Sequence, residues 1–441
     1  MKIRFVTLGC KLNFAESSAL GRELLARGHQ KASQSEVPDV CVVNTCSVTD
    51  AADHKDRQAI NQLHRKYPHA IIIVTGCYAQ LQPDQVSKIE GVDYVLGQNE
   101  KYSITQLVDE LCDSLEDGVP PTGRPTGYSL EAQKIRVGKI REVEEFHGVH
   151  SGDDRTRCFI KVQDGCNYFC SYCTIPYARG KSRNPWISEV VEEAKKALQD
   201  GAKELILTGV NIGDFGRSTG ESFIELLRAL DELGNEEMRQ EARGMDYRVR
   251  ISSCEPNLLT DEIIDFVAQS KHFAPHFHIP LQSGSNEVLK IMGRRYTREL
   301  FAERVRHIKE VMPHAFIGVD CMVGVRGETE AYWEYYLAFI KQLDVSQLHV
   351  FTYSERANTR MLEMDLYVVP KAERQRRSKI LHEVSEEKTK AFYAQHAGRK
   401  AVVLWESKKE GDQMAGFTDN YIKVYRPYEK AKVNTFEEIL L

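Results

Sequence analysis

Short apolar runs alternate with stretches of helical periodicity along most of this chain, and this alternation restricts the fold more than any other feature. Near the amino terminus such runs occupy residues 2–8, 40–43 and 70–75, and a helical pattern follows each of them. Strands that alternate with helices pair in parallel, and the helices cover both faces of the sheet. The amino-terminal part is therefore predicted to be an α/β domain with an open parallel sheet.

A cysteine follows each of these three runs. Cys10, Cys46 and Cys77 stand in the segments TLGC, VNTC and VTGC. Functional groups gather at the carboxyl ends of parallel strands, so cysteines at equivalent turns are expected to meet at one edge of the sheet. We interpret them as ligands of one iron–sulfur cluster; the alternative is three small buried thiols.

Six further apolar runs continue the alternation, near residues 158–162, 204–208, 248–252, 276–279, 316–321 and 347–351. About six β/α units predict a barrel or partial barrel, whose chemistry faces the carboxyl ends of its strands.

A cysteine-rich loop follows the first of these strands. Cys166, Cys170 and Cys173 form the spacing C-x3-C-x2-C within DGCNYFCSYC. This spacing lets one loop place three thiolates on an iron–sulfur cube and leaves the fourth iron without a protein ligand. The alternatives are unrelated thiols or a zinc site, but zinc normally takes four closed ligands and no partner pair stands nearby.

Two other strand ends carry polar candidates for ligand binding. Asn211 lies among glycines in LTGVNIGDFG, where the backbone could approach a ligand closely or simply form a turn. Gln282 and Ser283 in HIPLQSGS could meet a nucleoside or an amino-acid group, whereas His278 is expected to be structural.

Composition adds limits on location and partners. The 441 residues carry a net charge of −5 and eleven cysteines. We see neither a signal peptide nor a membrane span, and we expect a cytoplasmic protein with no membrane partner. An odd number of cysteines in a reducing compartment favours metal ligands and buried thiols over disulfides. Any contact with RNA must come from local basic patches, because the overall charge is slightly negative.

The carboxyl-terminal part no longer alternates strand and helix patterns. A polar helix is predicted to follow Pro370, and after it come short strand patterns in which lysines alternate with aromatic residues. Such a β-module can bind RNA through charge and stacking, although alternating aromatics also build a simple β core.

Several segments together resemble the methylthiotransferase family of the radical S-adenosylmethionine (SAM) superfamily. The resemblance rests on VQDGCNYFCSYCTIPYARG, HIPLQSGSNEVLKIMGRRY and GFTDNYIKV, and TLGCKLN and VNTCSVTDAADHKDRQ are most similar to the MtaB-like branch. It implies a flavodoxin-like amino-terminal domain (1–113), a linker (114–154), a partial (β/α)6 radical SAM barrel (155–370), a connecting helix (371–398) and a TRAM-like RNA-binding module (399–441). The chain ends soon after Tyr428, so the last strand of that module is expected to be short or missing.

The resemblance also implies a reaction. One [4Fe–4S] cluster on Cys166, Cys170 and Cys173 would cleave SAM to a 5′-deoxyadenosyl radical, with Tyr172 against the adenine. A second [4Fe–4S] cluster on Cys10, Cys46 and Cys77 would carry the sulfur. The product would be a methylthio group at C2 of N6-threonylcarbamoyladenosine beside the anticodon of tRNA. A reductant such as flavodoxin or ferredoxin is expected as a partner.

Two other functions stay open at this point. One is methylthiolation of an aspartate on ribosomal protein S12, and the other is an RNA-binding iron–sulfur sensor without turnover. Arg179, in PYARG, is a candidate for holding the threonylcarbamoyl group.

Overall fold

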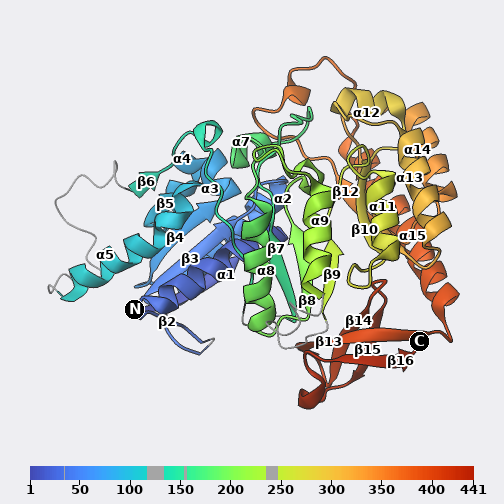
Figure 1. The fold of residues 1–441 in the computed structure, drawn as a ribbon. Helices are drawn as coiled ribbons and strands as arrows, with labels where there is room; N and C mark the ends of the chain where they lie inside the picture. Colours follow the sequence, from blue (N-terminus) through green and yellow to red (C-terminus); the bar gives the residue numbers. More distant parts are fainter. Residues whose placement is uncertain (34, 117–133, 153–155, 235–246) are drawn as a thin grey trace.

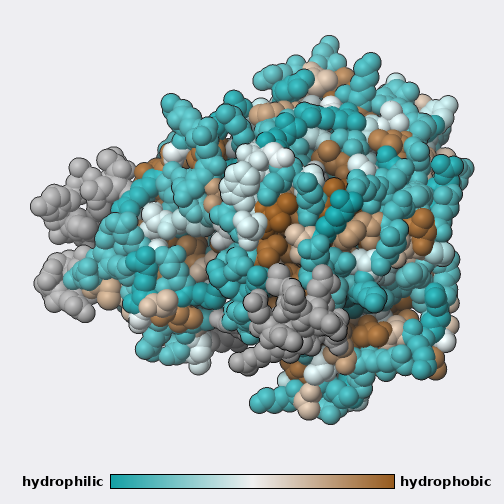
Figure 2. Space-filling model, viewed as in Figure 1, coloured by the Kyte–Doolittle hydropathy of each residue, from teal (hydrophilic) through white to brown (hydrophobic). Residues whose placement is uncertain are grey.

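The computed structural model describes residues 1–33, 35–116, 134–152, 156–234 and 247–441. Figure 1 shows an amino-terminal α/β domain beside a larger α/β barrel, with a small sheet at the carboxyl terminus. Figure 2 shows that hydrophilic side chains dominate the visible face and that hydrophobic ones form small separate patches. No helix in the described ranges is long and apolar enough to cross a membrane.

The amino-terminal domain is built on a parallel sheet of six strands in the order β2-β1-β3-β4-β5-β6. Every residue of β3 and β4 is buried, as central strands covered on both faces require. The strands are β1 (Lys2–Thr7), β2 (Gln30–Lys31), β3 (Val40–Thr45), β4 (Ile71–Gly76), β5 (Tyr94–Leu96) and β6 (Ile135–Arg136). The helices are α1 (Lys11–Ala26), α2 (Asp50–Lys66), α3 (Cys77–Leu81), α4 (Pro83–Ser87) and α5 (Ile104–Glu116).

One strand of this sheet comes from the segment that the sequence suggested as a linker. β6 pairs with β5 through Val95–Ile135 and Leu96–Arg136. A strand of two residues is too short to show any periodicity, so only pairing reveals it. Most of the Pro- and Gly-rich part of the same segment lies outside the described residues.

The second unit is a partial barrel of six parallel strands. Its two ladders, β7-β8-β9 and β10-β11-β12, are joined by the single bridges Val249–Phe273 and Ser253–His278. The strands are β7 (Arg157–Lys161), β8 (Glu204–Thr208), β9 (Arg248–Ile251), β10 (His276–Gln282), β11 (Phe316–Val323) and β12 (Gln347–Thr352). The helices are α7 (Ile175–Arg179), α8 (Ile187–Gln199), α9 (Phe223–Asp231), α11 (Asp261–Gln269), α12 (Asn286–Met292), α13 (Arg298–Val311) and α14 (Glu330–Gln342).

Residues alternate between the two faces of each barrel strand. Val249, Ile251 and Ile279 face outward into the hydrophobic core beneath the helices. The intervening positions, which include Arg250 and His278, therefore face the inside of the barrel. Polar side chains of β9 and β10 thus line the inside of the barrel.

The amino-terminal domain contacts both edge strands of the partial barrel. α1 lies against β7. Beyond the other edge, Arg356 follows β12 and pairs with Asp50 and Asp53 at the start of α2, at 2.6 and 2.7 Å. The first domain thus spans the opening between β7 and β12.

The carboxyl-terminal module is an antiparallel sheet in the order β15-β14-β13-β16, reached through the long helix α15 (Lys371–His396). Its strands are β13 (Lys400–Glu410), β14 (Gln413–Thr418), β15 (Lys423–Pro427) and β16 (Phe436–Leu440). The expectation that the last strand is short or missing was wrong, because β16 pairs with β13 from Lys400–Leu440 to Leu404–Phe436.

Some aromatics of this module serve packing. Trp405 is buried, and the Tyr421 hydroxyl accepts a hydrogen bond from Arg157 of the barrel at 3.1 Å. The Arg157 guanidinium also lies 4.6 Å from the Phe417 ring. Tyr425 is 50% exposed and remains available to a partner.

Candidate functional site

The three cysteines of the amino-terminal triplet meet at one edge of the amino-terminal sheet. Cys10, Cys46 and Cys77 follow β1, β3 and β4, which are neighbours. The turn at Gly9 has φ +97°, and a Cβ added there would lie 2.6 Å from the Cys46 Cβ. Burial, together with Cys77 and Cys10, raises the pKa of the Cys46 thiol to about 12. The topology therefore gathers cysteines that are far apart in the sequence.

The second triplet, Cys166, Cys170 and Cys173, lies in the loop between β7 and α7. The Cys173 backbone N–H donates to the Cys170 carbonyl at 3.0 Å, and the Tyr168 N–H donates to the Cys166 Sγ at 3.4 Å. Burial raises the pKa of the Cys166 thiol to about 11. A backbone that donates to sulfur is suited to holding a thiolate.

The donor chemistry of both triplets fits a multi-iron cluster. In the described part of the chain, no three Cys, His, Asp or Glu side chains lie close enough to share a single metal ion. A cube instead takes one thiolate on each of several irons, which lie apart. Because the thiol pKa values are raised, cluster binding must displace the thiol protons.

Arg294 links the cysteine loop to the barrel, although its sequence position gave no sign of this. Its Nη1 donates to the Cys170 Sγ at 3.3 Å and to the Tyr172 hydroxyl at 3.4 Å, and its Nη2 pairs with Glu255. Donors to a ligand sulfur orient it and influence the bound metal. The contact joins residues 124 positions apart, so spacing alone could not reveal it.

The polar residues suggested for SAM lie at strand ends inside the protein. Gln282 ends β10 with φ +64°, and its buried Oε1 has no hydrogen-bond partner among the described residues. Asn211 is 3% exposed, and its side-chain amide forms no well-aligned hydrogen bond within the described part of the chain, while Ser283 is fully buried. Unpartnered buried polar atoms and a strained backbone are typical of a site that a ligand completes. Tyr172 packs against the apolar cluster around Val325.

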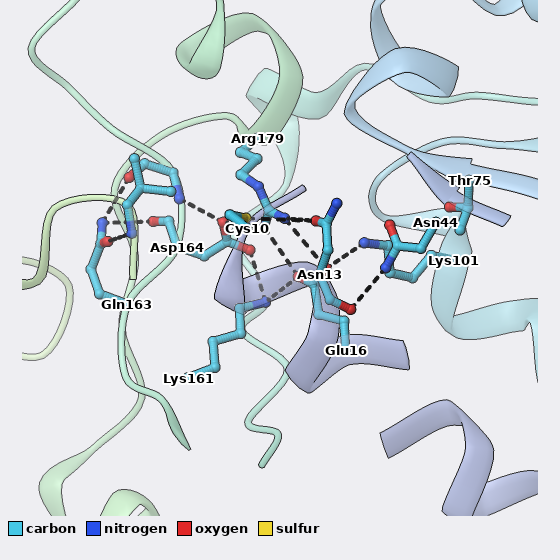
Figure 3. A network of polar contacts seen from close by, with 12 residues as sticks. Cys10, Asn13, Glu16, Asn44, Thr75, Lys101, Lys161, Gln163, Asp164 and Arg179 are labelled. Atoms are coloured by element: carbon cyan, nitrogen blue, oxygen red, sulfur yellow. Dashed lines mark hydrogen bonds and ion pairs between the residues drawn. The ribbon is translucent and has the colours of Figure 1, made fainter. Parts of the chain in front are cut away.

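A buried network of charges lies beside Cys10 and includes Asp164, two residues before Cys166 (Figure 3). The Glu16 carboxylate of α1 pairs with Lys101 at 2.5 Å, Arg179 at 3.0 Å and Lys161 at 3.2 Å. Asp164, just before the cysteine loop, pairs with Arg179 at 3.0 Å and with Lys161 at 2.8 Å. Burial acts to raise the pKa of Glu16, but the three cations hold it well below its usual range. The network therefore ties the two domains together through ionised groups.

Arg179 has a different place from the one that the sequence suggested. Its guanidinium is 1% exposed, and Nη2 donates to the Asn13 Oδ1 at 2.7 Å. Asn13 in turn lies 3.9 Å from the Cys10 Sγ. Both terminal nitrogens of Arg179 donate hydrogen bonds to protein groups, so they are not available to a substrate in this structure. Arg179 instead links the two domains.

Gly165 allows a testable change beside the cysteine loop. It has φ +68°, and an added Cβ would lie 1.9 Å from the Lys181 carbonyl oxygen. We expect Gly165→Ala to move this backbone, to cost on the order of 1–3 kcal/mol of stability through strain, and to lower the iron content of reconstituted protein. Urea unfolding and iron analysis measure both effects.

Gly201→Ala is the matched control, because Gly201 also has positive φ (+93°) but no atom within 4 Å of the added Cβ. It should cost about 1 kcal/mol and leave the iron content unchanged. Equal effects of the two substitutions would contradict the role given to the Gly165 contact.

Comparisons with known proteins agree with this architecture. Residues 160–340 match the radical SAM superfamily, and residues 2–97 match the family described as uncharacterized protein family UPF0004. The threonylcarbamoyladenosine tRNA methylthiotransferase MtaB of Bacillus subtilis (strain 168) is 35% identical over 429 residues, 96% of this chain and 89% of that protein. The MtaB protein of Aquifex aeolicus (strain VF5) is 34% identical over 431 residues, 97% of each chain.

More distant relatives share the fold. A tRNA-2-methylthio-N(6)-dimethylallyladenosine synthase of Pelotomaculum thermopropionicum is 30% identical over 431 residues, 94% of this chain and 88% of that protein. The solved radical SAM methyltransferase TsrM from Kitasatospora setae aligns with a TM-score of 0.52 and 16% identity over 80% of this chain and 74% of its own. At that identity the likeness concerns the fold alone.

The α/β barrel, its cysteine loop and the matching family together define a radical SAM enzyme with an added amino-terminal α/β domain. Within that class, the chain belongs to the methylthiotransferase family, in the branch of the MtaB proteins. The fold class and the resemblance predicted from the sequence are confirmed.

Proposed function

We propose that this enzyme adds a methylthio group to C2 of N6-threonylcarbamoyladenosine beside the anticodon of tRNA. The observation that carries the proposal is the placement of two cysteine triplets on the two sides of one domain interface, joined by the Glu16–Arg179 network. The names of relatives that match nearly the whole chain supply the substrate.

The side chains divide the work by position. Cys166, Cys170 and Cys173 would hold one [4Fe–4S] cluster, and Cys10, Cys46 and Cys77 would hold the other. When bound, these clusters and two SAM molecules supply the electron, the radical and the sulfur that an inert adenine C–H requires. Asn211, Gln282 and Ser283 would orient SAM at the strand ends, and Arg294 would hold the Cys170 sulfur in place.

The tRNA substrate and the reductant are the proposed partners. The carboxyl-terminal sheet exposes Lys408, Lys409 and Tyr425, a combination that suits RNA backbone and base contacts. A flavodoxin or ferredoxin in the cytoplasm would deliver the electron.

Nucleoside mass spectrometry of tRNA tests the function directly. A deletion strain should lack 2-methylthio-N6-threonylcarbamoyladenosine and accumulate the form without the methylthio group, and the wild-type gene should restore it. Methylthiolated isopentenyladenosine should be unchanged, which serves as the internal control. A normal tRNA profile together with loss of the modified aspartate of ribosomal protein S12 would overturn the proposal.

A further inference from the structure

Lys11 connects the amino-terminal domain to the inside of the barrel. It directly follows Cys10 and begins α1, and its Nζ lies 3.3 Å from the Ser252 Oγ. Ser252 follows β9 and continues the inward-facing positions of Arg248 and Arg250. The ammonium group therefore reaches from the edge of the first cysteine triplet into the barrel interior.

Glu204 and Asp320 lie within electrostatic reach of Lys11, but among the described residues no carboxylate forms an ion pair with it. The arginines near it have such partners: Arg157 pairs with Glu406 at 2.8 Å, and Arg250 pairs with Glu204 at 3.1 Å. Among the described residues, Lys11 has the Ser252 hydroxyl as its hydrogen-bond partner and no ion pair. An amine in this setting gains most from an anionic group brought by a ligand.

A second unpartnered group lies on the same inner surface. The buried Nδ1 of His276, on β10, has no hydrogen-bond partner among the described residues, and the side chain is 7% exposed. Both His276 and His349 lie within electrostatic reach of Lys11. An unsatisfied polar atom near an ammonium group that has no ion pair among the described residues indicates a polar ligand in this part of the barrel.

The place of Lys11 favours the substrate over SAM as the source of that anion. Lys11 adjoins Cys10, whereas the cysteine loop of the barrel has its own cation, Arg294, beside Cys170. The accepting adenine must come close to the Cys10 triplet if sulfur is transferred from there. The threonylcarbamoyl substituent of that base carries a free carboxylate, which a neutral alkyl substituent does not.

We propose that Lys11 binds the carboxylate of the threonylcarbamoyl group and thereby selects the acid-bearing adenosine over adenosines with neutral N6 substituents. This inference rests on the proposed function and assigns a specificity-determining residue to it. Lys11 contacts the N6 substituent, whereas the chemistry at C2 depends on the two cysteine triplets and the clusters that they would hold.

Binding of two anticodon stem–loop RNAs to the reconstituted holoenzyme tests this assignment. One RNA carries N6-threonylcarbamoyladenosine, and the other carries the same base with the carboxylate converted to a neutral amide. Wild-type protein should bind the first on the order of tenfold to a hundredfold more tightly, as for a hydrogen bond to a charged group. Lys11→Met should remove this preference by weakening only the acid-bearing RNA, and Lys11→Arg should keep most of it.

Lys139→Met is the control, because the Lys139 side chain is 83% exposed and Glu142 is its one ion-pair partner among the described residues. This variant should bind both RNAs as the wild type does. Equal wild-type affinity for the two RNAs, or equal weakening of both by Lys11→Met, would overturn the inference. If Lys11→Met loses iron, the affinities of the wild-type protein for the two RNAs remain measurable, and equal affinities would still overturn the inference. Mass spectrometry of the same wild-type incubations with SAM and dithionite separates this result from failure of the proposed function, which would give no methylthiolated base in either RNA.

Discussion

Replacement of Cys10, Cys46 and Cys77 by alanine should stop methylthio transfer and leave 5′-deoxyadenosine formation intact. The three thiols lie at the ends of β1, β3 and β4, apart from the loop that holds the other triplet. Their removal takes away the ligands of one cluster, and iron should fall from about eight to about four per chain. The measurement is product analysis by mass spectrometry in parallel with iron and sulfide determination.

The reciprocal variant is the matched control. Alanine at Cys166, Cys170 and Cys173 should also leave about four irons, but here 5′-deoxyadenosine formation should disappear together with transfer. Wild-type protein with about four irons would remove the second cluster from this account. Transfer by the variant without Cys10, Cys46 and Cys77 would show that the sulfur comes from another source.

The sequence predicted the positions of the barrel strands well because these depend on local pattern. β8 is found at Glu204–Thr208 as predicted, and the other barrel strands begin and end within a few residues of their predicted bounds. In a parallel sheet, adjacent strands end at one edge, so cysteines after β1, β3 and β4 had to become neighbours once the topology was known. Local order and topology bring Cys10, Cys46 and Cys77 to one edge of the sheet and Cys166, Cys170 and Cys173 into one loop, and their role as cluster ligands stays a prediction.

The parts that could not be predicted depend on contacts between distant segments. The Arg179–Glu16 pair joins residues 163 positions apart, and Lys11 meets Ser252 across 241. From the sequence, a lone arginine beside a cysteine motif can equally be a substrate-binding residue or a residue that links two domains. Only the packed structure distinguishes the two roles. β6 and β16 were missed for a related reason, since each owes its identity to pairing with a strand elsewhere.

Substitution of Arg179 by methionine should destabilise the protein by about 3 kcal/mol or more, because it removes buried hydrogen bonds to Glu16, Asp164 and Asn13, those to charged groups being worth about 1.5–3 kcal/mol each. Glu16 and Asp164 would lose a guanidinium at 3.0 Å from each. Urea unfolding monitored by circular dichroism measures the change. Arg228→Met is the control: Arg228 is 53% exposed in its pair with Glu262 and should cost no more than about 1 kcal/mol.

Adding Glu16→Gln to Arg179→Met should lower the stability further, since the Glu16 carboxylate also pairs with the buried Lys101 and Lys161. Recovery of stability in the double variant would mean that these two lysines do not compensate the charge of Glu16. Arg179→Met should also affect SAM cleavage and methylthio transfer differently. Arg179 lies in α7, which follows Cys173, and contacts α1, which begins beside Cys10. In Arg179→Met, the rate of methylthio transfer should fall more than the rate of 5′-deoxyadenosine formation. A radical is useful only where the sulfur and the adenine are held beside it, and we expect the buried network to help hold the two domains in that arrangement.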